Sequence, residues 1–216
     1  MRDLGVFLDE RLTFGEHVDV IVRKSNRALG ALMRSFQTGR RGRSLHDCSR
    51  KAVLAAYCAN VRSILEFASV VWGGAADVHM KRVERVQHRF LMWLCGRTRD
   101  SGVSFEYDAL LDHFRMAPLA TRREQHDIMF IRNIHCQAID SSFLLERFPL
   151  AVAPRQLRKR MLFHVPYARV NTIKSSAFCR LPNLCNAFLD SNRDVDLWHH
   201  TASSFKTRVI AHVRIR

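Results

Sequence analysis

Residues 61–72 read VRSILEFASVVW, and the fold of the surrounding chain can be worked out from them. The stretch is apolar except at four positions. Two of these, Arg62 and Glu66, are four residues apart, so on a helix they lie on one face and can form an ion pair. Gly73-Gly74 then ends the helix. We therefore predict a buried helix with one internal ion pair, whose large buried side chains are Phe67, Val71 and Trp72.

Helical periodicity continues on both sides of this stretch. Small apolar residues precede it, so we predict one long helix that begins at a Ser44 cap and ends near Trp72. Two more helices are predicted, from Phe14 to Phe36 and from Asp77 to Gly96, because apolar residues recur at steps of three and four. These residues are Phe14, Val18, Ile21, Val22, Ala28, Leu29, Leu32, Met33 and Phe36 in the first, and Val83, Val86, Phe90, Leu91 and Leu94 in the second.

The first residues predict a short β-hairpin. Leu4–Leu8 is an apolar run suited to a strand, Asp9–Arg11 suits a turn, and Leu12–Phe14 follows as a second extended segment. A hairpin of this size is marginal in water by itself. Thr13 and Glu16 have the spacing of a capping box, which predicts how the next helix begins.

A polar connection at 97–103 predicts a boundary between two halves of the chain. After it we predict a short helix at 105–113 and a longer one that begins at Pro118 and reaches about Ala138. Arg122-Arg123 lies on the first turn of the longer helix, and its inward residues are predicted to be Leu119, Ile128, Phe130, Ile131 and Ile134.

Four prolines predict irregular chain over residues 148–182. Short helices are predicted after it, at 183–189 and from Asp196 to the end, the last with Trp198, Phe205, Val209 and Val213 turned inward. The expected fold class is therefore mainly α, with a short N-terminal β-hairpin. The expected parts are a hairpin at 1–14, a helical domain at 15–96 and a helical, partly irregular region at 97–216.

The charge of the chain predicts a polyanionic partner. Thirty-five Lys and Arg residues stand against twenty Asp and Glu residues, which gives a net charge of +15, and only six of the basic residues are Lys. The planar fork of Arg suits phosphate, which favours nucleic acid. An anionic membrane surface is less favoured because the basic residues are spread along the chain instead of lying beside one apolar helix. No apolar run reaches transmembrane length.

Two long segments contain no acidic residue, namely 20–46 and 147–189. Such segments repel themselves unless a polyanion is near, although two solvated faces with counterions are the alternative. The predicted phosphate contacts lie in the first segment and on the helix from Asp77: Arg23, Lys24, Arg27, Arg34, Arg40, Arg41 and Arg43, and then Lys81, Arg82, Arg85 and Arg89. Arg62, Glu66 and Trp72 are predicted to be structural.

The sequence offers little for metal binding or catalysis. The metal candidates are His199-His200, His135-Cys136 and the Cys179/Cys185 pair, and none has the two-pair spacing of a zinc site. There is no Gly-x-Ser-x-Gly motif and no phosphate-binding glycine loop with a lysine. Clustered carboxylates, which two-metal phosphoryl transfer needs, are also absent. Without a CxxC pair or a signal peptide, we expect an intracellular protein, nuclear or cytoplasmic, with reduced cysteines.

Several blocks of the chain resemble non-LTR retrotransposon reverse transcriptases of the jockey-like, LINE type. DLGVFLDERLTFGEHVDVIVRKSNRALGALMR (3–34) resembles the end of the palm and the start of the thumb, with Leu4, Gly5, Val6, Asp9, Leu12, Phe14, His17, Lys24, Ala28, Leu29 and Leu32 as the matching residues. The next blocks match at Tyr57, Val61, Arg62, Ser63, Leu65, Glu66, Phe67, Ala68, Ser69 and Trp72, and at Glu84, Gln87, Arg89 and Phe90. Later matches are Leu119, Arg122, Arg123 and Asp127, and then Arg158, Phe163, Pro166, Arg169, Asn171, Arg180 and Asn186.

The resemblance implies a thumb and downstream region that grips an RNA/DNA template–primer duplex. The parent enzymes are RNA-directed DNA polymerases whose Mg²⁺-binding carboxylates lie in the palm, which we expect upstream of Leu4 together with fingers and an endonuclease. This chain is therefore expected to hold no cofactor and to lack polymerase activity by itself. Phe178 stands where the pattern has Pro, and no Cys/His knuckle follows, which suits a truncated or decayed copy.

Two hypotheses follow for the function. The first is a piece of a transposable-element reverse transcriptase that still binds the backbone of a template–primer duplex. The alternative is an inert pseudogene product, or a helical module for protein–protein interaction without nucleic acid binding. A third possibility is a polymerase whose catalytic half comes from another chain, and it requires a partner that the sequence does not identify.

Overall fold

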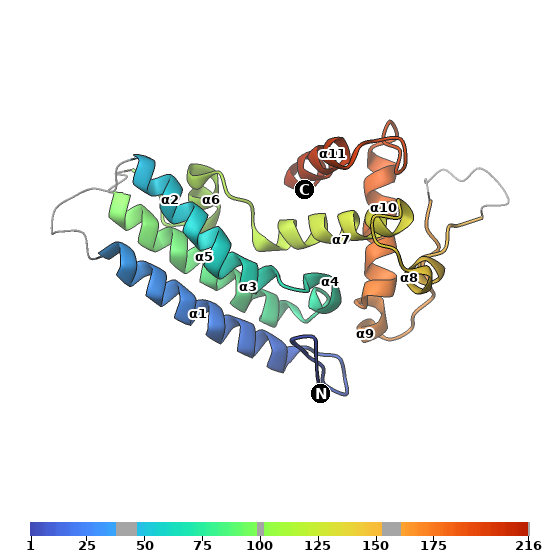
Figure 1. Cartoon of the computed structure of the whole chain (residues 1–216), viewed down its shortest axis with the longest axis horizontal. Coiled ribbons are helices and arrows are strands. Elements are labelled where there is room, and N and C mark those ends of the chain that lie inside the picture. Colours follow the sequence, from blue (N-terminus) through green and yellow to red (C-terminus); the bar gives the residue numbers. More distant parts are fainter. Residues whose placement is uncertain (38–46, 99–101, 153–160, 216) are drawn as a thin grey trace. The chain divides into compact units, whose positions relative to one another are not determined.

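The computed structural model describes residues 1–37, 47–98, 102–152 and 161–215. The chain divides into two compact units. The first contains Met1–Ala68 and Ala75–Ala120, and the second contains Ser69–Gly74 and Thr121–Arg216. As expected, the described chain is mainly helical, with one short antiparallel hairpin at its N-terminus (Figure 1).

The first unit is a hairpin followed by helices that pack lengthwise. Figure 1 shows α1, the helix that runs from α2 into α3, and α5 side by side. Its elements are β1 (Arg2–Asp3), β2 (Val6–Phe7), α1 (Gly15–Gln37), α2 (Asp47–Tyr57), the π-helical segment η1 (Cys58–Arg62), α3 (Ser63–Glu66), α5 (Asp77–Thr98) and α6 (Tyr107–Phe114).

The hairpin is tighter than the sequence predicted. Leu4 and Gly5 form the turn between β1 and β2, with positive φ angles of 43° and 93°, where we expected Leu4–Leu8 to be a strand. A two-residue turn with positive φ at both positions matches the twist of paired strands, and Gly adopts such angles freely. The strand prediction was right for Val6–Phe7 and wrong for Leu4-Gly5, because it counted the apolar Leu4 and ignored the glycine beside it.

The entrance to α1 also differs from the predicted capping box. The Asp9 carboxylate accepts hydrogen bonds from the backbone N–H groups of Arg11, Thr13 and Phe14, and from the Thr13 hydroxyl. These donors lower the pKa of Asp9, the Thr13 N–H most of all. Thr13 in turn accepts from the Gly15 N–H, and no hydrogen bond between Thr13 and Glu16 is found among the described residues.

The helix–helix core of the first unit uses the predicted apolar faces. Five of the nine residues predicted for the first helix are buried, namely Phe14, Val18, Ile21, Leu29 and Leu32, and the other four are partly buried. All five predicted residues of α5 are buried. Tyr57 stacks on Phe90 with ring centroids 3.9 Å apart and planes 4° from parallel. Stacking of this kind adds specificity to the apolar contact between α2 and α5.

The predicted long helix ends early. The helical path continues through α2, η1 and α3, but Phe67 leaves it with a ψ angle of 126°, and Ala68 has a positive φ of 51°. Phe67 is 53% exposed and Val71 46% exposed, so the prediction that both are buried was wrong. The chain leaves the first unit at this break. The next helix, α4 (Ser69–Trp72), belongs to the second unit. Trp72 is fully buried, as expected.

Two further boundaries differ from prediction. Helix α5 continues through Gly96 to Thr98, and α7 (Leu119–His135) begins one residue after Pro118. The two units divide at Ala120/Thr121 instead of at 97–103. Helix α6 packs against α5, and hydrogen bonds from Leu119 and Ala120 to Glu84 hold the start of α7 to the first unit.

The second unit is built around α7 and α10 (Ala177–Ser191). Its other helices are α4, α8 (Ser142–Arg147), α9 (Asn171–Lys174) and α11 (Ala202–Ile215). Figure 1 shows α11 at the C-terminal end of the chain. Its core is formed by Ile128, Ile131, Ile134, Phe148, Phe163, Leu181, Cys185, Phe188, Leu189, Val195, Leu197, Phe205, Val209 and Val213.

Helix α10 corrects the prediction of irregular chain up to residue 182. Pro182 lies inside this helix and is buried. A proline there removes one helical hydrogen bond, and the burial of Leu181, Cys185, Phe188 and Leu189 on the same helix offsets that loss. The final helix starts at Ala202, later than the predicted Asp196, and Trp198 is 44% exposed instead of turned inward. Phe130 is also only partly buried.

Among the described residues, no helix is long and apolar enough to cross a membrane.

Candidate nucleic-acid interface

Helices α1 and α5 lie beside one another and run parallel. Three contacts join them in the same order along both helices: Asp19 to Arg82 at 2.5 Å, Asn26 Oδ1 to Arg89 Nη1 at 3.4 Å, and the Phe36 carbonyl to Arg97 Nη2 at 3.2 Å. The parallel arrangement brings the basic part of α1 next to the basic part of α5, although the two lie about sixty residues apart in the sequence.

A hollow of about 280 Å³ lies between these two helices. Two side chains from α1 and four from α5 line it: Val22, Asn26, Arg82, Arg85, Val86 and Arg89. Its floor is apolar, since Val86 is buried, and its rim carries three guanidinium groups. Arg82 is paired with Asp19, whereas the described structure gives Arg85 no ion pair.

Three arginines of α1 continue this surface outward. Arg23, Arg27 and Arg34 are all exposed, and their spacing of four and seven residues puts them on one ridge of a helix with 3.6 residues per turn. That ridge adjoins Asn26, which lines the hollow. Lys24 is exposed but lies on the opposite side of α1 from Val22 and Asn26, because it stands about 160–200° around the helix from them. Lys24 therefore does not line the hollow, although it lies one helical turn from Arg27.

We call the arginines and lysine of this surface the basic face: Arg23, Arg27 and Arg34 of α1, with Lys81, Arg82, Arg85 and Arg89 of α5. Little negative charge opposes it. Helix α1 has no acidic residue after Asp19, and Asp19 is engaged by Arg82. On α5, Glu84 is drawn to the far side of the helix, where it is bound by other groups.

The groups that hold Glu84 form a polar network inside the first unit. Its carboxylate accepts from the N–H groups of Leu119 and Ala120, at 3.2 and 2.6 Å, and from the Tyr107 hydroxyl at 2.6 Å. Burial, reinforced by the Glu84 charge, raises the pKa of Tyr107. Glu84 therefore acts as the N-terminal cap of α7, where a negative charge is favoured by the helix dipole.

Gln87 connects this network to the stacked aromatic pair. Its amide nitrogen donates to the Tyr107 hydroxyl and to the Ala117 carbonyl, and its amide oxygen accepts from the Tyr57 hydroxyl at 3.3 Å. Burial raises the pKa of Tyr57 as well. A fully buried amide is stable only when its hydrogen bonds are made, so we assign Gln87 to structure.

A buried ion pair has the same structural role in the second unit. Arg180 Nε and Nη2 lie 2.9 and 3.4 Å from the two carboxylate oxygens of Asp127, and Arg180 also donates to the carbonyls of Ser175 and Val70. Desolvation raises the pKa of Asp127 to about 6 and outweighs the opposing effect of Arg180. Gly74 packs against this centre, because a Cβ there would lie 1.9 Å from the Ser175 carbonyl oxygen.

The remaining predicted residues divide into three groups. Arg62 Nε lies 3.8 Å from Glu66 Oε1, the pair expected from their spacing, and Trp72 is fully buried. Lys81 is exposed, one turn before Arg85 on α5. Arg40, Arg41 and Arg43 lie outside the described residues.

The roles of Glu84, Gln87, Asp127 and Arg180 were not assigned by reasoning from the residues alone. One signal was available: Gln87 interrupts the apolar face formed by Val86, Phe90 and Leu91, and a polar residue in that position must find internal partners. The positions of these partners follow only from the tertiary structure.

The described residues form no cluster of three or more His, Cys, Asp or Glu side chains that could hold a metal ion. Two of the metal candidates are engaged elsewhere. The His135 ring lies 2.9 Å from the Phe148 carbonyl oxygen, and the Cys136 thiol donates to the Leu197 carbonyl. Burial lowers the pKa of His135. The structure shows Cys58, Cys95, Cys136, Cys179 and Cys185 as free thiols.

Comparison with known proteins leaves the resemblance to reverse transcriptases as an inference from the sequence. No protein-family model, curated protein or solved structure matches the chain.

Proposed function

We propose that the chain binds the phosphate backbone of a nucleic acid duplex, an RNA/DNA hybrid above all, through the basic face of α1 and α5. The observation that carries the proposal is that three arginines of α5 line a hollow beside α1, while three further arginines are exposed on the neighbouring ridge of α1. In the described structure, no acidic side chain neutralises Arg23, Arg27, Arg34 or Arg85.

The chemistry of the basic face suits phosphates more than bases. Guanidinium groups bind phosphate oxygens with paired hydrogen bonds, and two parallel ridges of them follow a charged backbone. Contacts of this kind supply affinity without reading sequence. The resemblance to the thumb of non-LTR reverse transcriptases supports an RNA/DNA hybrid as the duplex. The proposal concerns binding alone and assigns no catalytic step to this chain.

The test measures binding of a fluorescently labelled RNA/DNA hybrid by anisotropy over a range of salt concentrations. The variant is Arg85→Gln/Arg89→Gln, and the matched control is Arg115→Gln/Lys206→Gln, which removes the same charge from exposed positions on other elements. Each phosphate contact contributes about 0.9 to the slope of log K against log salt. We expect the slope to fall by about 1.8 in the variant and to stay unchanged in the control.

Two results would contradict the proposal. Equal losses in the variant and the control would mean that only the net charge matters. Absence of hybrid binding by the unaltered chain at low salt would favour the alternative of an inert or protein-binding helical module.

A further inference from the structure

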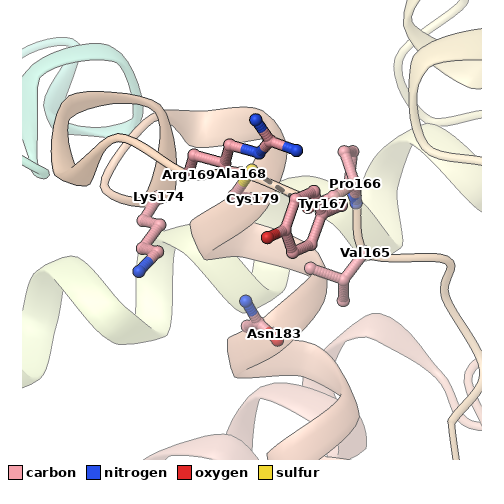
Figure 2. Close-up of a pocket in the computed structure, with 8 residues that line it drawn as sticks. All are labelled: Val165, Pro166, Tyr167, Ala168, Arg169, Lys174, Cys179 and Asn183. Carbon is pink, nitrogen blue, oxygen red and sulfur yellow. Dashed lines mark hydrogen bonds between the residues drawn. The ribbon is translucent and has the colours of Figure 1, made fainter.

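A second hollow lies in the second unit, where the chain between residues 165 and 169 passes α9 and α10 (Figure 2). Its volume is about 650 Å³, within the range of about 300–1,000 Å³ typical of ligand pockets. Its polar and aromatic lining residues are Tyr167, Arg169, Lys174 and Asn183. Figure 2 shows the side chains of Tyr167, Lys174 and Asn183 around one opening.

Tyr167 is unusual because it is a large aromatic side chain that is 86% exposed. Its neighbours are well anchored. The Cys179 thiol, which is buried on α10, donates to the Pro166 carbonyl at 3.7 Å, and Phe163 is in the core. The ring is therefore presented to solvent by a fixed backbone. An aromatic face held in this way is suited to stack on a planar partner.

The charge around Tyr167 is entirely positive in the sequence. Arg169 and Lys174 are exposed on the rim, and no Asp or Glu occurs between residues 147 and 189. Asn183 adds an exposed side-chain amide with both a donor and an acceptor. The hollow thus combines a stacking surface, two cations and one hydrogen-bonding amide.

We propose that this hollow binds single-stranded nucleic acid, with one unpaired base stacked on Tyr167. Arg169 and Lys174 hold the phosphates next to that base, and the Asn183 amide meets its edge. An unpaired base is required because the faces of paired bases are covered by their neighbours in a duplex. An acidic peptide would use the two cations but would leave the aromatic face and the amide without a role. This site is separate from the basic face and does not depend on it.

The experiment uses the whole chain carrying Arg85→Gln/Arg89→Gln, so that the basic face contributes less to the signal. Affinity for a short oligouridylate is measured before and after Tyr167→Ala, Tyr167→Phe and Phe105→Ala. The last removes an exposed aromatic residue outside the hollow. Stacking on one base accounts for about a 5- to 150-fold difference in affinity. We expect a loss in that range for Tyr167→Ala, nearly unchanged binding for Tyr167→Phe, and no change for Phe105→Ala.

Photocrosslinking locates the base directly. An oligonucleotide with one 5-iodouracil should crosslink to Tyr167, as identified by mass spectrometry. The proposal is overturned if Tyr167→Ala binds like its parent, or if crosslinks fall only on other elements. It is also overturned if Tyr167→Ala weakens duplex binding as much as single-strand binding, or if Tyr167 is needed only for binding to anionic lipid vesicles. The Arg85→Gln/Arg89→Gln variant should lose duplex binding and keep single-strand binding that depends on Tyr167. That result would show that the hollow and the basic face are independent binding sites.

Discussion

Burying the charged carboxylate of Asp127 costs free energy, and the ion pair that it forms with Arg180 helps to fix the surrounding backbone. Its side chain is almost fully buried, and two of its hydrogen-bond donors come from Arg180. Desolvation still prevails, so the pKa of Asp127 is raised to about 6 in the folded chain. Buried ion pairs of this kind often add little net stability, yet they hold several backbone segments in one arrangement. Here Arg180 also binds the carbonyls of Val70 and Ser175.

The raised pKa predicts a pH-dependent contribution to stability. Between about pH 4 and pH 6 the folded chain binds more protons at Asp127 than the unfolded chain does. The contribution of this group is therefore fully present below about pH 4 and is lost as the pH rises through about 6. We expect the difference in unfolding free energy between the unaltered chain and Asp127→Asn to fall by about 2 kcal/mol from pH 4 to pH 7.

Urea denaturation of the unaltered chain and of Asp127→Asn at several pH values measures this difference. The other titrating groups are the same in both proteins, so their contributions cancel. Asp140→Asn, at an exposed position after α7, is the control and should show a flat difference. A flat difference for Asp127→Asn as well would show that the carboxyl has an ordinary pKa in the folded chain.

At the scale of elements, α7 depends on a cap from a distant helix. Glu84 of α5 receives the N–H groups of Leu119 and Ala120, which have no partner within their own helix at its first turn. Helix α6 offers a contrast. Glu106 is its N-terminal cap residue, and the side chain of Glu106 makes no capping hydrogen bond. The carboxylate of Glu84 therefore caps a helix start that lies 35 residues further along the chain, whereas that of Glu106 does not cap the helix that it precedes.

We expect Glu84→Ala to destabilise the first unit by about 2–3 kcal/mol, because it leaves two backbone donors and the Tyr107 hydroxyl without their acceptor. Glu106→Ala should change stability by less than about 0.5 kcal/mol. Denaturation midpoints measure both effects, and faster hydrogen exchange at the Leu119 and Ala120 amides identifies the lost cap. If the two variants lose equal stability, the cap is not formed in solution.

For the whole molecule, the important feature is that the second unit is discontinuous in sequence. Ser69–Gly74 belong to it, although α5 and α6 follow before the chain returns to it at Thr121. Val70 packs against the core of the second unit and gives its carbonyl to Arg180. Trp72 adds one of the largest fully buried side chains in the described structure.

Because of this arrangement, we expect the two units to differ in how much stability they keep when each is produced as a separate fragment. A fragment 1–120 keeps every segment of the first unit and should unfold cooperatively. A fragment 121–216 lacks Ser69–Gly74 and should melt at a lower temperature than the same residues do in the whole chain, because Arg180 loses one acceptor and the core loses the packing of Val70. Thermal melts followed by circular dichroism measure this. Equal melting of 121–216 alone and in the whole chain would show that Ser69–Gly74 contribute nothing to the second unit.

The sequence by itself determined the helices and most of their buried faces. The periodic apolar residues of α1 and α5 and the ion pair of Arg62 with Glu66 follow from spacing along one helix, and the burial of Trp72 follows from its large apolar side chain; both are local information. Prediction failed where two weak local preferences competed. Leu4-Gly5 suited either a strand or a turn, and the structure has a turn. Phe67-Ala68 suited either a continuing helix or a break, and the helix breaks there. Pro182 suited either a helix end or a position inside a helix, and it lies inside α10.

Only the tertiary structure decided which side chains meet. The parallel packing of α1 and α5 placed Arg85 and Arg89 beside Asn26 and left Lys24 on the other side of its helix. The partners of Glu84 and Asp127 lie 23 to 53 residues away in the sequence. The physical reason is that periodicity reports whether a side chain faces the core, whereas the identity of its partner depends on how the helices pack, and that information is held jointly by segments far apart in the chain.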